Sequence, residues 1–226
     1  MTVLVVAAHP DDEVLGAGAS MARFAAEGRP VHTLILGEGA TSRVDDRTEA
    51  DRDELDALVA SSREAARRLG TAAPVHGGLP DNRFDGVDLL DVVKLVEREL
   101  ERVQPDLVLT HFAGDLNVDH RITASAVVTA TRPQPAQGVR TVLSFEVPSA
   151  TEWAFGTTGA GFEPTTFIDV SATLATKLHA LEAYAGELRP SPHARSLEAI
   201  EHLARWRGAT VGCEAAEAFH LVRAVR

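Results

Sequence analysis

Short runs of Val, Leu and Ile alternate along the chain with longer segments in which apolar residues recur at helical spacing. This alternation is typical of successive βαβ units, which build a mostly parallel sheet with helices on both faces. The pattern therefore predicts an α/β fold. The expected strands are residues 3–8, 31–36, 74–76, 106–110 and 141–146, with a last strand within 211–222.

The helical segments are long enough to cross from one parallel strand to the next. Helices are expected over residues 13–27, 54–69, 87–102 and 119–130, and two more near 172–185 and 196–207. Gly28 and Gly70 directly follow the first two and suit their ends, because glycine readily takes the left-handed conformation common after a helix. Residues 148–164 show neither period, which predicts a long loop near the ligand-binding edge.

No linker rich in Pro, Gly or Ser divides the 226 residues, so we expect one domain over residues 1–226. With 45% hydrophobic and 24% charged residues, the composition is that of a globular protein rather than a disordered one. The formal net charge of −11 argues against a nucleic-acid partner, which needs a concentrated basic surface. A small-molecule partner fits better, and the sequence leaves a homo-oligomer open.

Cys213 is the single cysteine, which excludes an intrachain disulfide and a Cys-rich zinc finger. The cytoplasm is therefore the simplest compartment. The opening segment 2–8 is apolar, but no basic region precedes it and it leads into polar residues, so we expect a buried strand rather than a signal peptide. No stretch approaches the ~18 consecutive apolar residues of a membrane-spanning helix, and we expect no membrane insertion.

Polar side chains follow the first predicted strand. The run Ala8-His9-Pro10-Asp11-Asp12-Glu13 places an imidazole and carboxylates in a turn at a carboxyl end of the sheet, where open parallel sheets bind ligands. The segment after the fourth strand adds Asp119-His120-Arg121. Two imidazoles and one carboxylate suit a catalytic zinc ion, which takes three protein ligands and keeps one position open. We expect His9, Asp12 and His120 to hold one zinc ion, although other divalent transition metals would also be accepted.

Asp11 lies beside a proposed ligand without having to be one. A carboxylate there can accept a proton from metal-bound water, so we expect Asp11 to be the general base. Asp119 is expected to orient an imidazole by accepting its hydrogen bond. A simpler alternative is that Asp11 and Asp12 only cap a helix and that His9 and His120 are separate core histidines, but this does not explain why the two clusters occur together.

Other acidic and imidazole side chains are assigned no chemistry. Asp115 is expected to be a loop or N-cap residue. Five histidines lie in apparent strands or on helix faces and belong to this group, and they are His32, His76, His179, His202 and His220.

Together, Ala-His-Pro-Asp-Asp-Glu after the first strand and Asp-His-Arg after the fourth resemble the LmbE-like (PIG-L) family of zinc-dependent N-acetylglucosaminyl deacetylases. The match in order and context extends over almost the whole chain. The resemblance implies a Rossmann-like fold, zinc bound by His9, Asp12 and His120, and Asp11 as general base. It also implies an N-deacetylase that hydrolyses the amide of an N-acetylated amino sugar or related small molecule, with zinc-bound water as nucleophile.

The chain departs from the family where many members carry His-x-Asp-His, because Asn117 stands in place of the first of these histidines. An amide can donate a hydrogen bond to an oxyanion but supplies no titrating proton near neutral pH. We therefore expect Asn117 to stabilise the oxyanion. His193, in a loop stiffened by two prolines, is the candidate general acid, although an exposed loop histidine explains it equally well. His111 is a weaker candidate, and Asp11 itself can carry the proton.

Three residues are candidates for substrate binding. Arg83 follows the third strand, in a segment that resembles one lining the cleft of similar family members, and a guanidinium can bind a hydroxyl, phosphate or carboxylate. Arg121 can do the same, or can form a salt bridge with Asp115 or Asp119. Trp153 offers a flat ring on which a sugar can stack, or it closes the core.

Two other classes of protein share some of these features. An iron(II) oxygenase binds its metal with the same set of two histidines and one carboxylate, but that chemistry is usually associated with all-β barrels. A non-catalytic sugar- or nucleotide-binding module is suggested by Gly16-Ala17-Gly18, which lacks the full dinucleotide fingerprint.

Overall fold

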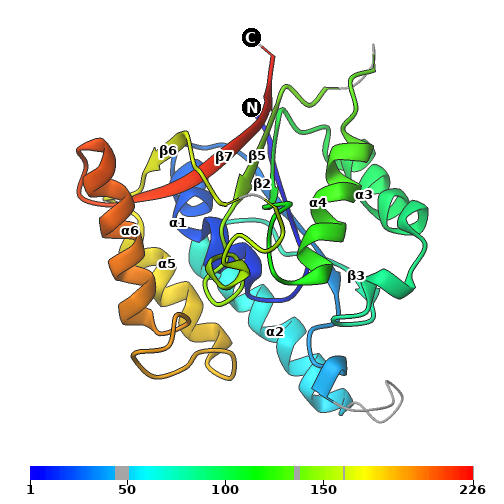
Figure 1. Ribbon diagram of the computed structural model, residues 1–226, viewed down its shortest axis with the longest axis horizontal. Helices are drawn as coiled ribbons and strands as arrows, with labels where there is room; N and C mark the ends of the chain where they lie inside the picture. Colours follow the sequence, from blue (N-terminus) through cyan, green and yellow to red (C-terminus); the bar gives the residue numbers. More distant parts are fainter. Residues whose placement is uncertain (44–50, 135–137, 160, 226) are drawn as a thin grey trace.

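Seven strands form one sheet in the computed structural model, which describes residues 1–43, 51–134, 138–159 and 161–225 (Figure 1). Their order across the sheet is β3-β2-β1-β4-β5-β7-β6. The first five strands are parallel, and β7 runs antiparallel to both of its neighbours. The strands are β1 Val3–Ala7, β2 Val31–Gly37, β3 Val75–Leu79, β4 Leu107–His111, β5 Thr141–Phe145, β6 Thr166–Asp169 and β7 Ala216–Ala224.

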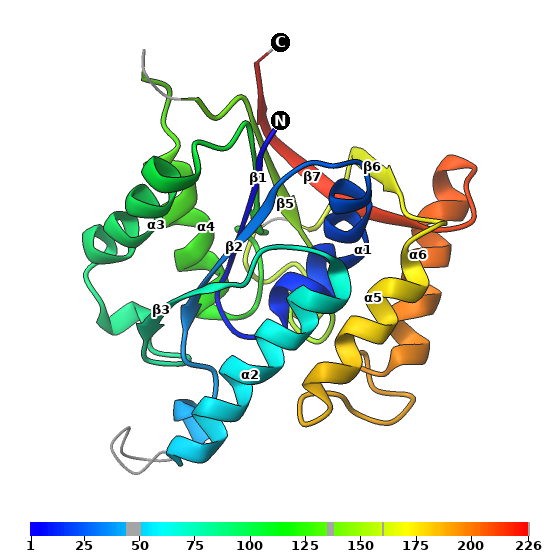
Figure 2. The same cartoon turned by 180° about the vertical axis from the view of Figure 1, so that it is seen from behind.

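Helices cover both faces of the sheet, as Figures 1 and 2 show from opposite sides. α3 and α4 pack together on one face, and α1, α2, α5 and α6 form the layer on the other face. Each layer buries its own hydrophobic cluster against the sheet, which confirms the predicted α/β, Rossmann-like fold. The helices are α1 Asp12–Ala26, α2 Arg52–Leu69, α3 Leu89–Val103, α4 Val118–Ala130, α5 Leu174–Leu181 and α6 Leu197–Val211.

The five predicted parallel strands are all present, and the main differences from the prediction lie in the C-terminal third. β6 is a four-residue strand at the edge of the sheet whose residues are exposed or half-buried, so it lacks the apolar run on which the prediction depends. α6 continues to Val211 and ends at Gly212, which has a φ of 81°. The last strand therefore begins at Ala216, inside the predicted range of 211–222, and continues to Ala224. In the described parts of the chain, no helix is long and apolar enough to cross a membrane.

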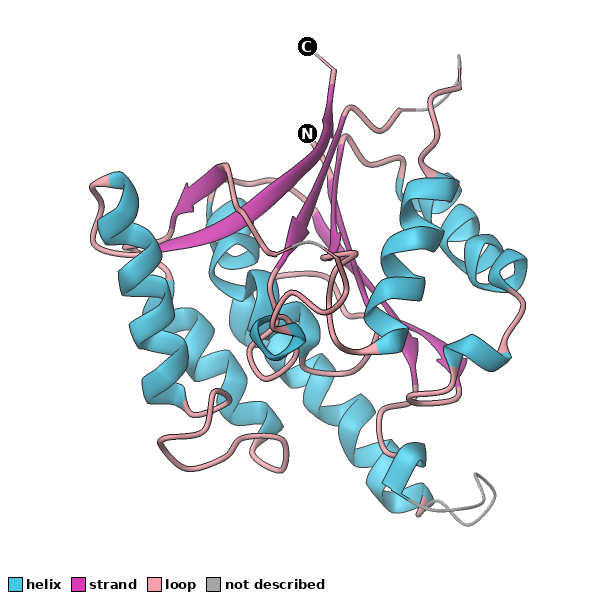
Figure 3. Ribbon diagram, in the orientation of Figure 1, coloured by secondary structure: helices cyan, strands magenta, loops and turns pink. Residues whose placement is uncertain are grey.

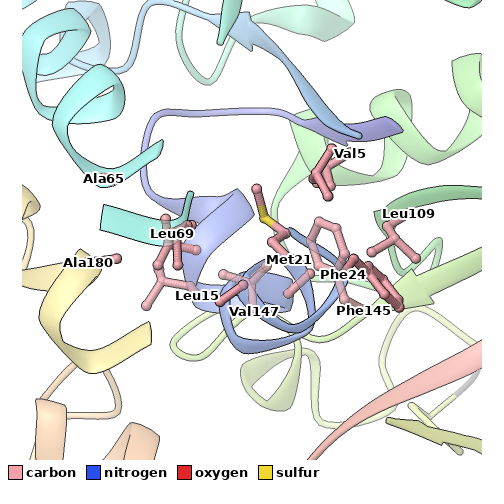
Figure 4. Close-up of a cluster of buried hydrophobic side chains, with 14 of the residues drawn as sticks. Val5, Leu15, Met21, Phe24, Ala65, Leu69, Leu109, Phe145, Val147 and Ala180 are labelled. Carbon is pink, nitrogen blue, oxygen red and sulfur yellow. The ribbon is translucent and has the colours of Figure 1, made fainter. Parts of the chain in front are cut away.

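The core between α1 and the sheet depends on a very close approach of the helix. Figure 4 shows Val5 and Phe145 of the sheet beside Met21 of α1, and Leu15 of the same helix near Leu69 of α2. A Cβ atom at Gly16 would lie 2.2 Å from Cδ2 of Phe145, so only glycine fits there. The Gly-Ala-Gly segment therefore serves helix–sheet packing, which removes the main argument for a nucleotide-binding module.

A buried ion pair joins α5 and β7 to the middle of α1. Nζ of Lys177 lies 2.6 Å from Oε1 of Glu217 and donates to the carbonyl oxygen of Leu15 at 2.7 Å. The carboxylate also accepts hydrogen bonds from the backbone N–H groups of Ala19 and Ser20. The pair thus ties the C-terminal third of the chain to the helix that begins at the ligand-binding edge.

The carboxyl ends of β1 and β4 define that edge. From β1 the chain winds outward through β2 to β3, and it then returns to β4 on the other side of β1. Such a change of direction opens a crevice between the carboxyl ends of the two strands. Both chain termini lie at the opposite end of the sheet, and loops gather at the carboxyl end in the view of Figure 3.

Candidate metal centre

Two histidines and one aspartate meet at the carboxyl ends of β1 and β4. His9 follows β1, Asp12 is the first residue of α1, and His120 lies in the first turn of α4. Oδ2 of Asp12 is 3.1 Å from Nδ1 of His9 and 3.2 Å from Nε2 of His120. In a tetrahedral zinc site with bonds of ~2.0 Å, neighbouring ligand atoms are roughly 3.3 Å apart. The three side chains therefore have the spacing of a zinc-type site.

Buried polar atoms of this triad lack hydrogen bonds. Nε2 of His120 lies close to Asp12, but neither it nor Oδ1 of Asp12 makes a well-formed hydrogen bond with the described residues. A buried polar atom without a partner is costly to stability. A cation between the three residues would satisfy both atoms, so the donor set fits a divalent metal of the zinc class.

Further carboxylates surround the two imidazoles. Nε2 of His9 lies 3.0 Å from Oδ2 of Asp119 and 3.1 Å from Oδ1 of Asp81. Nδ1 of His120 lies 3.2 Å from Oδ1 of Asp115. Carboxylates in such outer positions orient metal-binding histidines and raise their basicity.

These carboxylates favour positive charge at the centre. Burial alone would lower the pKa of His9, but its hydrogen bonds to Asp119 and Asp12 raise the pKa to about 10. Burial also opposes charge on His120, yet Asp12 and Asp115 raise the pKa of this histidine to about 9. Protons and a divalent cation compete for a centre of this kind. The electrostatics thus agree with the geometry.

The sequence predicts only part of these contacts between carboxylates and imidazoles. Asp119 lies within hydrogen-bond distance of an imidazole, but the imidazole is that of His9 rather than that of the adjacent histidine. Asp115 was expected to be only a loop or N-cap residue, but its completely buried carboxylate faces His120. Asp81 was not connected with the metal site at all. Its position after the third strand, at the same carboxyl edge, is the signal that would have suggested it.

His111 supports the centre from the core side. It is completely buried, and its ring stacks on that of His120 with the centroids 4.0 Å apart. Its Nε2 accepts a hydrogen bond from the backbone N–H of Ala8 at 2.8 Å, so this nitrogen carries no proton. Burial and the neighbouring imidazole hold the pKa of His111 well below its usual range. This environment argues against His111 as the proton donor.

Asp11 occupies the turn between β1 and α1. Its φ of 109° is a conformation that residues other than glycine seldom adopt, and only 3% of the residue is exposed. Burial raises the pKa of Asp11 to about 8, although the charge of Arg195 opposes this rise. Nη1 of Arg195 donates a hydrogen bond to Oδ2 of Asp11 at 2.9 Å. The sequence pattern does not indicate this contact, although Arg195 lies in the same loop as His193.

A polar cavity of about 150 Å³ opens beside the triad. His9 and Asp11 form part of its wall, and polar side chains from other segments complete it, among them Ser42, Asn82 and Arg195. A cavity lined in this way suits a small ligand with several hydrogen-bonding groups.

Asn117 also lines the cavity, and it is the N-cap of α4. Its Oδ1 accepts a hydrogen bond from the backbone N–H of Asp119 at 2.8 Å, and its Nδ2 donates to Oδ1 of Asn82 at 2.8 Å. These bonds hold the side-chain amide of Asn117 in place. They use one of its two N–H hydrogens and leave the other to donate. The assignment of Asn117 to oxyanion stabilisation stays a prediction.

The two predicted substrate-binding arginines differ in their surroundings. Arg83 is exposed and precedes the short 3₁₀ helix Phe84–Gly86. Arg121 donates to the carbonyl oxygen of Asp115 at 2.9 Å, so it contacts the backbone rather than the carboxylate considered as its alternative partner. This contact fastens the loop that precedes α4.

Trp153 and His193 lie against each other. Trp153 belongs to the short 3₁₀ helix Glu152–Ala154 and is 41% exposed, so it does not close the core. Its ring meets that of His193 edge to face, with the centroids 5.6 Å apart. Nδ1 of His193 accepts a hydrogen bond from the backbone N–H of Arg195 at 3.0 Å. His193 therefore contributes to the shape of the loop that carries Arg195.

Residues 4–131, more than half of the chain, match the family model described as PIG-L: GlcNAc-PI de-N-acetylase. The matched segment contains the triad, its outer carboxylates and Asp11. The chain therefore belongs to the PIG-L family, which confirms the resemblance seen in the two sequence motifs. Neither this family nor the parallel sheet supports an iron(II) oxygenase.

Curated relatives named as deacetylases match over different lengths. The uncharacterized deacetylase YaiS of Escherichia coli is 29% identical over 190 residues, which are 80% of this chain and 89% of YaiS. The 1D-myo-inositol 2-acetamido-2-deoxy-α-D-glucopyranoside deacetylase of Mycobacteroides abscessus is 32% identical over 151 residues, which are 57% of this chain and 54% of that protein. The alignment thus spans only about half of the mycobacterial relative.

Solved structures share the whole fold. The N,N′-diacetylchitobiose deacetylase of Pyrococcus horikoshii superposes with a TM-score of 0.78 at 18% identity, over 98% of this chain and 84% of that one. The 4-carboxy-2-hydroxymuconate hydratase of Pseudomonas putida superposes with a TM-score of 0.77 at 25% identity, over 100% of this chain and 98% of that one. Proteins named for two different reactions therefore share this architecture.

Proposed function

We propose that this protein is a metal-dependent N-deacetylase that hydrolyses the amide of an N-acetylated amino sugar or a related small molecule. The observation that carries the proposal is the buried triad of His9, Asp12 and His120 beside the Asp11 carboxylate in a polar cavity. Family membership and the names of the deacetylase relatives support the same reaction.

The triad would hold one divalent cation, and zinc is the expected ion because its preferred ligands are imidazole nitrogen and carboxylate oxygen in tetrahedral geometry. Asp119 and Asp115 would keep the two imidazoles in the orientation that binding requires. When bound, such a cation polarises an amide carbonyl and lowers the pKa of water toward ~7.

Asp11 would accept the proton of the attacking water. Its carboxylate lies in the cavity wall next to the triad, and burial raises the pKa of this carboxyl, which makes Asp11 a stronger base than an exposed carboxylate. Asn117 would donate its remaining amide hydrogen to the oxyanion that forms on the substrate carbonyl. The hydrogen bond to Asn82 holds this amide in place.

The departing nitrogen needs a proton, and two groups are candidates for its donor. Asp11 is favoured because it holds the proton taken from water and already lines the cavity. His193 is the alternative suggested by the sequence, and its observed contacts are with Trp153 and the backbone of Arg195.

Recognition of the substrate would depend on hydrogen bonds around the cavity. Ser42 and Asn82 line it with hydroxyl and amide groups, which suit the hydroxyls of a sugar. Arg83 and Arg121 would contact polar groups of the substrate that extend beyond the cavity. The half-exposed ring of Trp153 offers a stacking surface for a sugar ring.

Acetate release tests the proposal directly. Metal-loaded protein is incubated with N-acetylglucosamine, N-acetylglucosaminyl inositol and N,N′-diacetylchitobiose, and free acetate and free amine are measured. Protein stripped by a chelator is the control. We expect equal amounts of both products from at least one substrate and none with the stripped protein. Absence of both products from every N-acetylated compound would overturn the proposal.

Hydration of a carbon–carbon double bond is a second candidate, favoured by the hydratase that is 25% identical over nearly its full length. The cation site and Asp11 would serve water addition as well, and Arg195 in the cavity wall would bind a substrate carboxylate. Incubation with an unsaturated dicarboxylate distinguishes the two reactions. Loss of the ultraviolet absorbance of the conjugated double bond, without acetate release from the sugars, would favour hydration.

A further inference from the structure

The C-terminal third of the chain contacts Asp11, although it lies beyond the segment that matches the family. The family match ends at residue 131. Two residues from later in the chain are connected to Asp11. Tyr184 is linked to the backbone N–H of Asp11 through Glu13, and Arg195 donates a hydrogen bond directly to the Asp11 side chain. The first of these connections fixes the backbone of Asp11, and the second fixes its carboxylate.

The backbone connection runs through the glutamate of the Ala-His-Pro-Asp-Asp-Glu motif. Oε2 of Glu13 accepts a hydrogen bond from the backbone N–H of Asp11 at 3.1 Å, and Oε1 accepts one from the hydroxyl of Tyr184 at 2.6 Å. Glu13 and Tyr184 are both almost completely buried. Because Asp11 has a φ of 109°, its backbone conformation needs such outside support.

The side-chain connection is made by a guanidinium held at two points. Nη1 of Arg195 binds Oδ2 of Asp11 at 2.9 Å, and Nε binds Oγ of Ser149 at 2.8 Å. The backbone N–H of Arg195 is bound in turn by Nδ1 of His193. The planar fork of arginine is suited to fixing a carboxylate in one orientation.

We propose that Arg195 and Tyr184 are positioning residues, which hold the Asp11 carboxylate against the reacting water from two sides. This inference rests on the proposed role of Asp11. A general base must lie within hydrogen-bond reach of the proton it takes, and a displacement of about 1 Å can reduce the rate ~10²-fold. Arg195 thus acts on the chemical step through Asp11 rather than through the metal.

Arg195→Ala tests the proposal, with Arg207→Ala as a matched control. Arg207 lies in the same third of the chain and forms a similarly half-buried pair with Glu146 through Nε and Nη2, away from the cavity. We expect Arg195→Ala to lower kcat ~10²-fold, because the base is misplaced, while KM and bound metal change little. Arg207→Ala should keep the kcat of the native protein.

Rescue separates positioning from a loss of folding. Addition of methylguanidinium at millimolar concentration should restore part of the kcat of Arg195→Ala, because the small cation can occupy the vacated place. Arg195→Lys should stay impaired, since a single ammonium group does not reproduce the bonds to both Asp11 and Ser149. Tyr184→Phe keeps the buried ring and loses only the hydrogen bond to Glu13, so a fall in kcat at constant metal content is expected there too.

Crystal structures of the metal-loaded variants supply a measurement that needs no turnover. The Asp11 carboxylate should be displaced or present in two conformers in Arg195→Ala, and unchanged in Arg207→Ala. Unchanged Asp11 coordinates, or a loss of kcat explained by lost metal or equally large in Arg207→Ala, would overturn the inference. If native protein releases no acetate but Asp11 is displaced only in Arg195→Ala, the proposed function fails and the positioning role stands.

Discussion

Oδ2 of Asp119 lies 3.0 Å from Nε2 of His9, so a carboxylate from the first turn of α4 orients the imidazole that follows β1. The two residues are far apart in the sequence, but β1 and β4 are neighbours in the sheet, and their carboxyl ends bring the two side chains together. The contact couples the two halves of the candidate metal centre.

This contact gives the first prediction. Asp119→Asn should weaken metal binding by roughly 10–100-fold, because loss of such an outer carboxylate leaves the imidazole less basic and less well oriented. Titration of stripped protein with zinc against a competing chelator measures the change. Asp88→Asn, an exposed aspartate before α3 whose side chain makes no capping bond, is the control. Equal affinity in both variants would contradict the assigned role of Asp119.

The metal ligands themselves should be individually necessary. We expect purified protein to hold about one zinc ion per chain, and His9→Ala, Asp12→Ala or His120→Ala to lose it, because a catalytic zinc site depends on three protein ligands. Elemental analysis after dialysis measures the content. Retention of a full equivalent by all three variants would show that the ion binds elsewhere.

Asp11→Asn is expected to keep both the metal and the fold. The amide has the same shape as the carboxylate but does not accept the proton of water, so turnover should fall by about 10²–10⁴-fold. Acetate release and zinc content are measured on the same preparation. Near-normal turnover would reduce Asp11 to a residue that shapes the turn before α1.

The buried ion pair between Lys177 and Glu217 should matter for stability rather than chemistry. Lys177→Met leaves a buried carboxylate without its partner, which typically costs about 3–5 kcal/mol. Urea unfolding of the variant should show a correspondingly lower midpoint. Arg205→Ala removes an exposed pair with Glu201 on α6, and we expect little change there. Equal midpoints for the two variants would contradict the importance of burial.

The sequence predicted the elements that obey local rules and the three side chains that meet at the candidate metal centre. β1, β2, β4 and β5 follow apolar runs, whereas β3 is a partly exposed strand with two glycines. His9, Asp12 and His120 follow strands whose carboxyl ends must meet in a parallel sheet. β6 was missed because a half-exposed edge strand has no strong apolar pattern.

Contacts made over long distances in the chain were harder to predict. Arg195 approaches Asp11 because its loop packs against Ser149, and no spacing in the sequence encodes that approach. Asp115 looked like an ordinary loop residue, since only the folded chain shows that its carboxylate faces His120. The structure thus adds mainly the partners of residues that the motifs had already indicated.

The last prediction concerns Asn117 and His193, where the chain differs from many members of its family. Asn117→Ala should slow turnover by ~10²–10³-fold if the amide donates to the oxyanion, without changing the shape of the pH–rate profile. The amide has no proton that titrates near neutral pH, so only the height of the profile should change. A changed shape would show that the residue affects a proton transfer.

His193 needs two variants, because its imidazole both binds the backbone of Arg195 and is a candidate proton donor. Asn at this position offers Oδ1 in place of Nδ1, so His193→Asn preserves the bond to Arg195 and removes the titrating ring. We expect His193→Asn to keep most of the turnover and the alkaline limb of the profile, because Asp11 carries the proton. His193→Ala should be slower, since the loop that holds Arg195 loses its anchor. Loss of the alkaline limb in both variants, with a smaller effect on substrates whose leaving group needs little protonation, would instead assign the proton to His193.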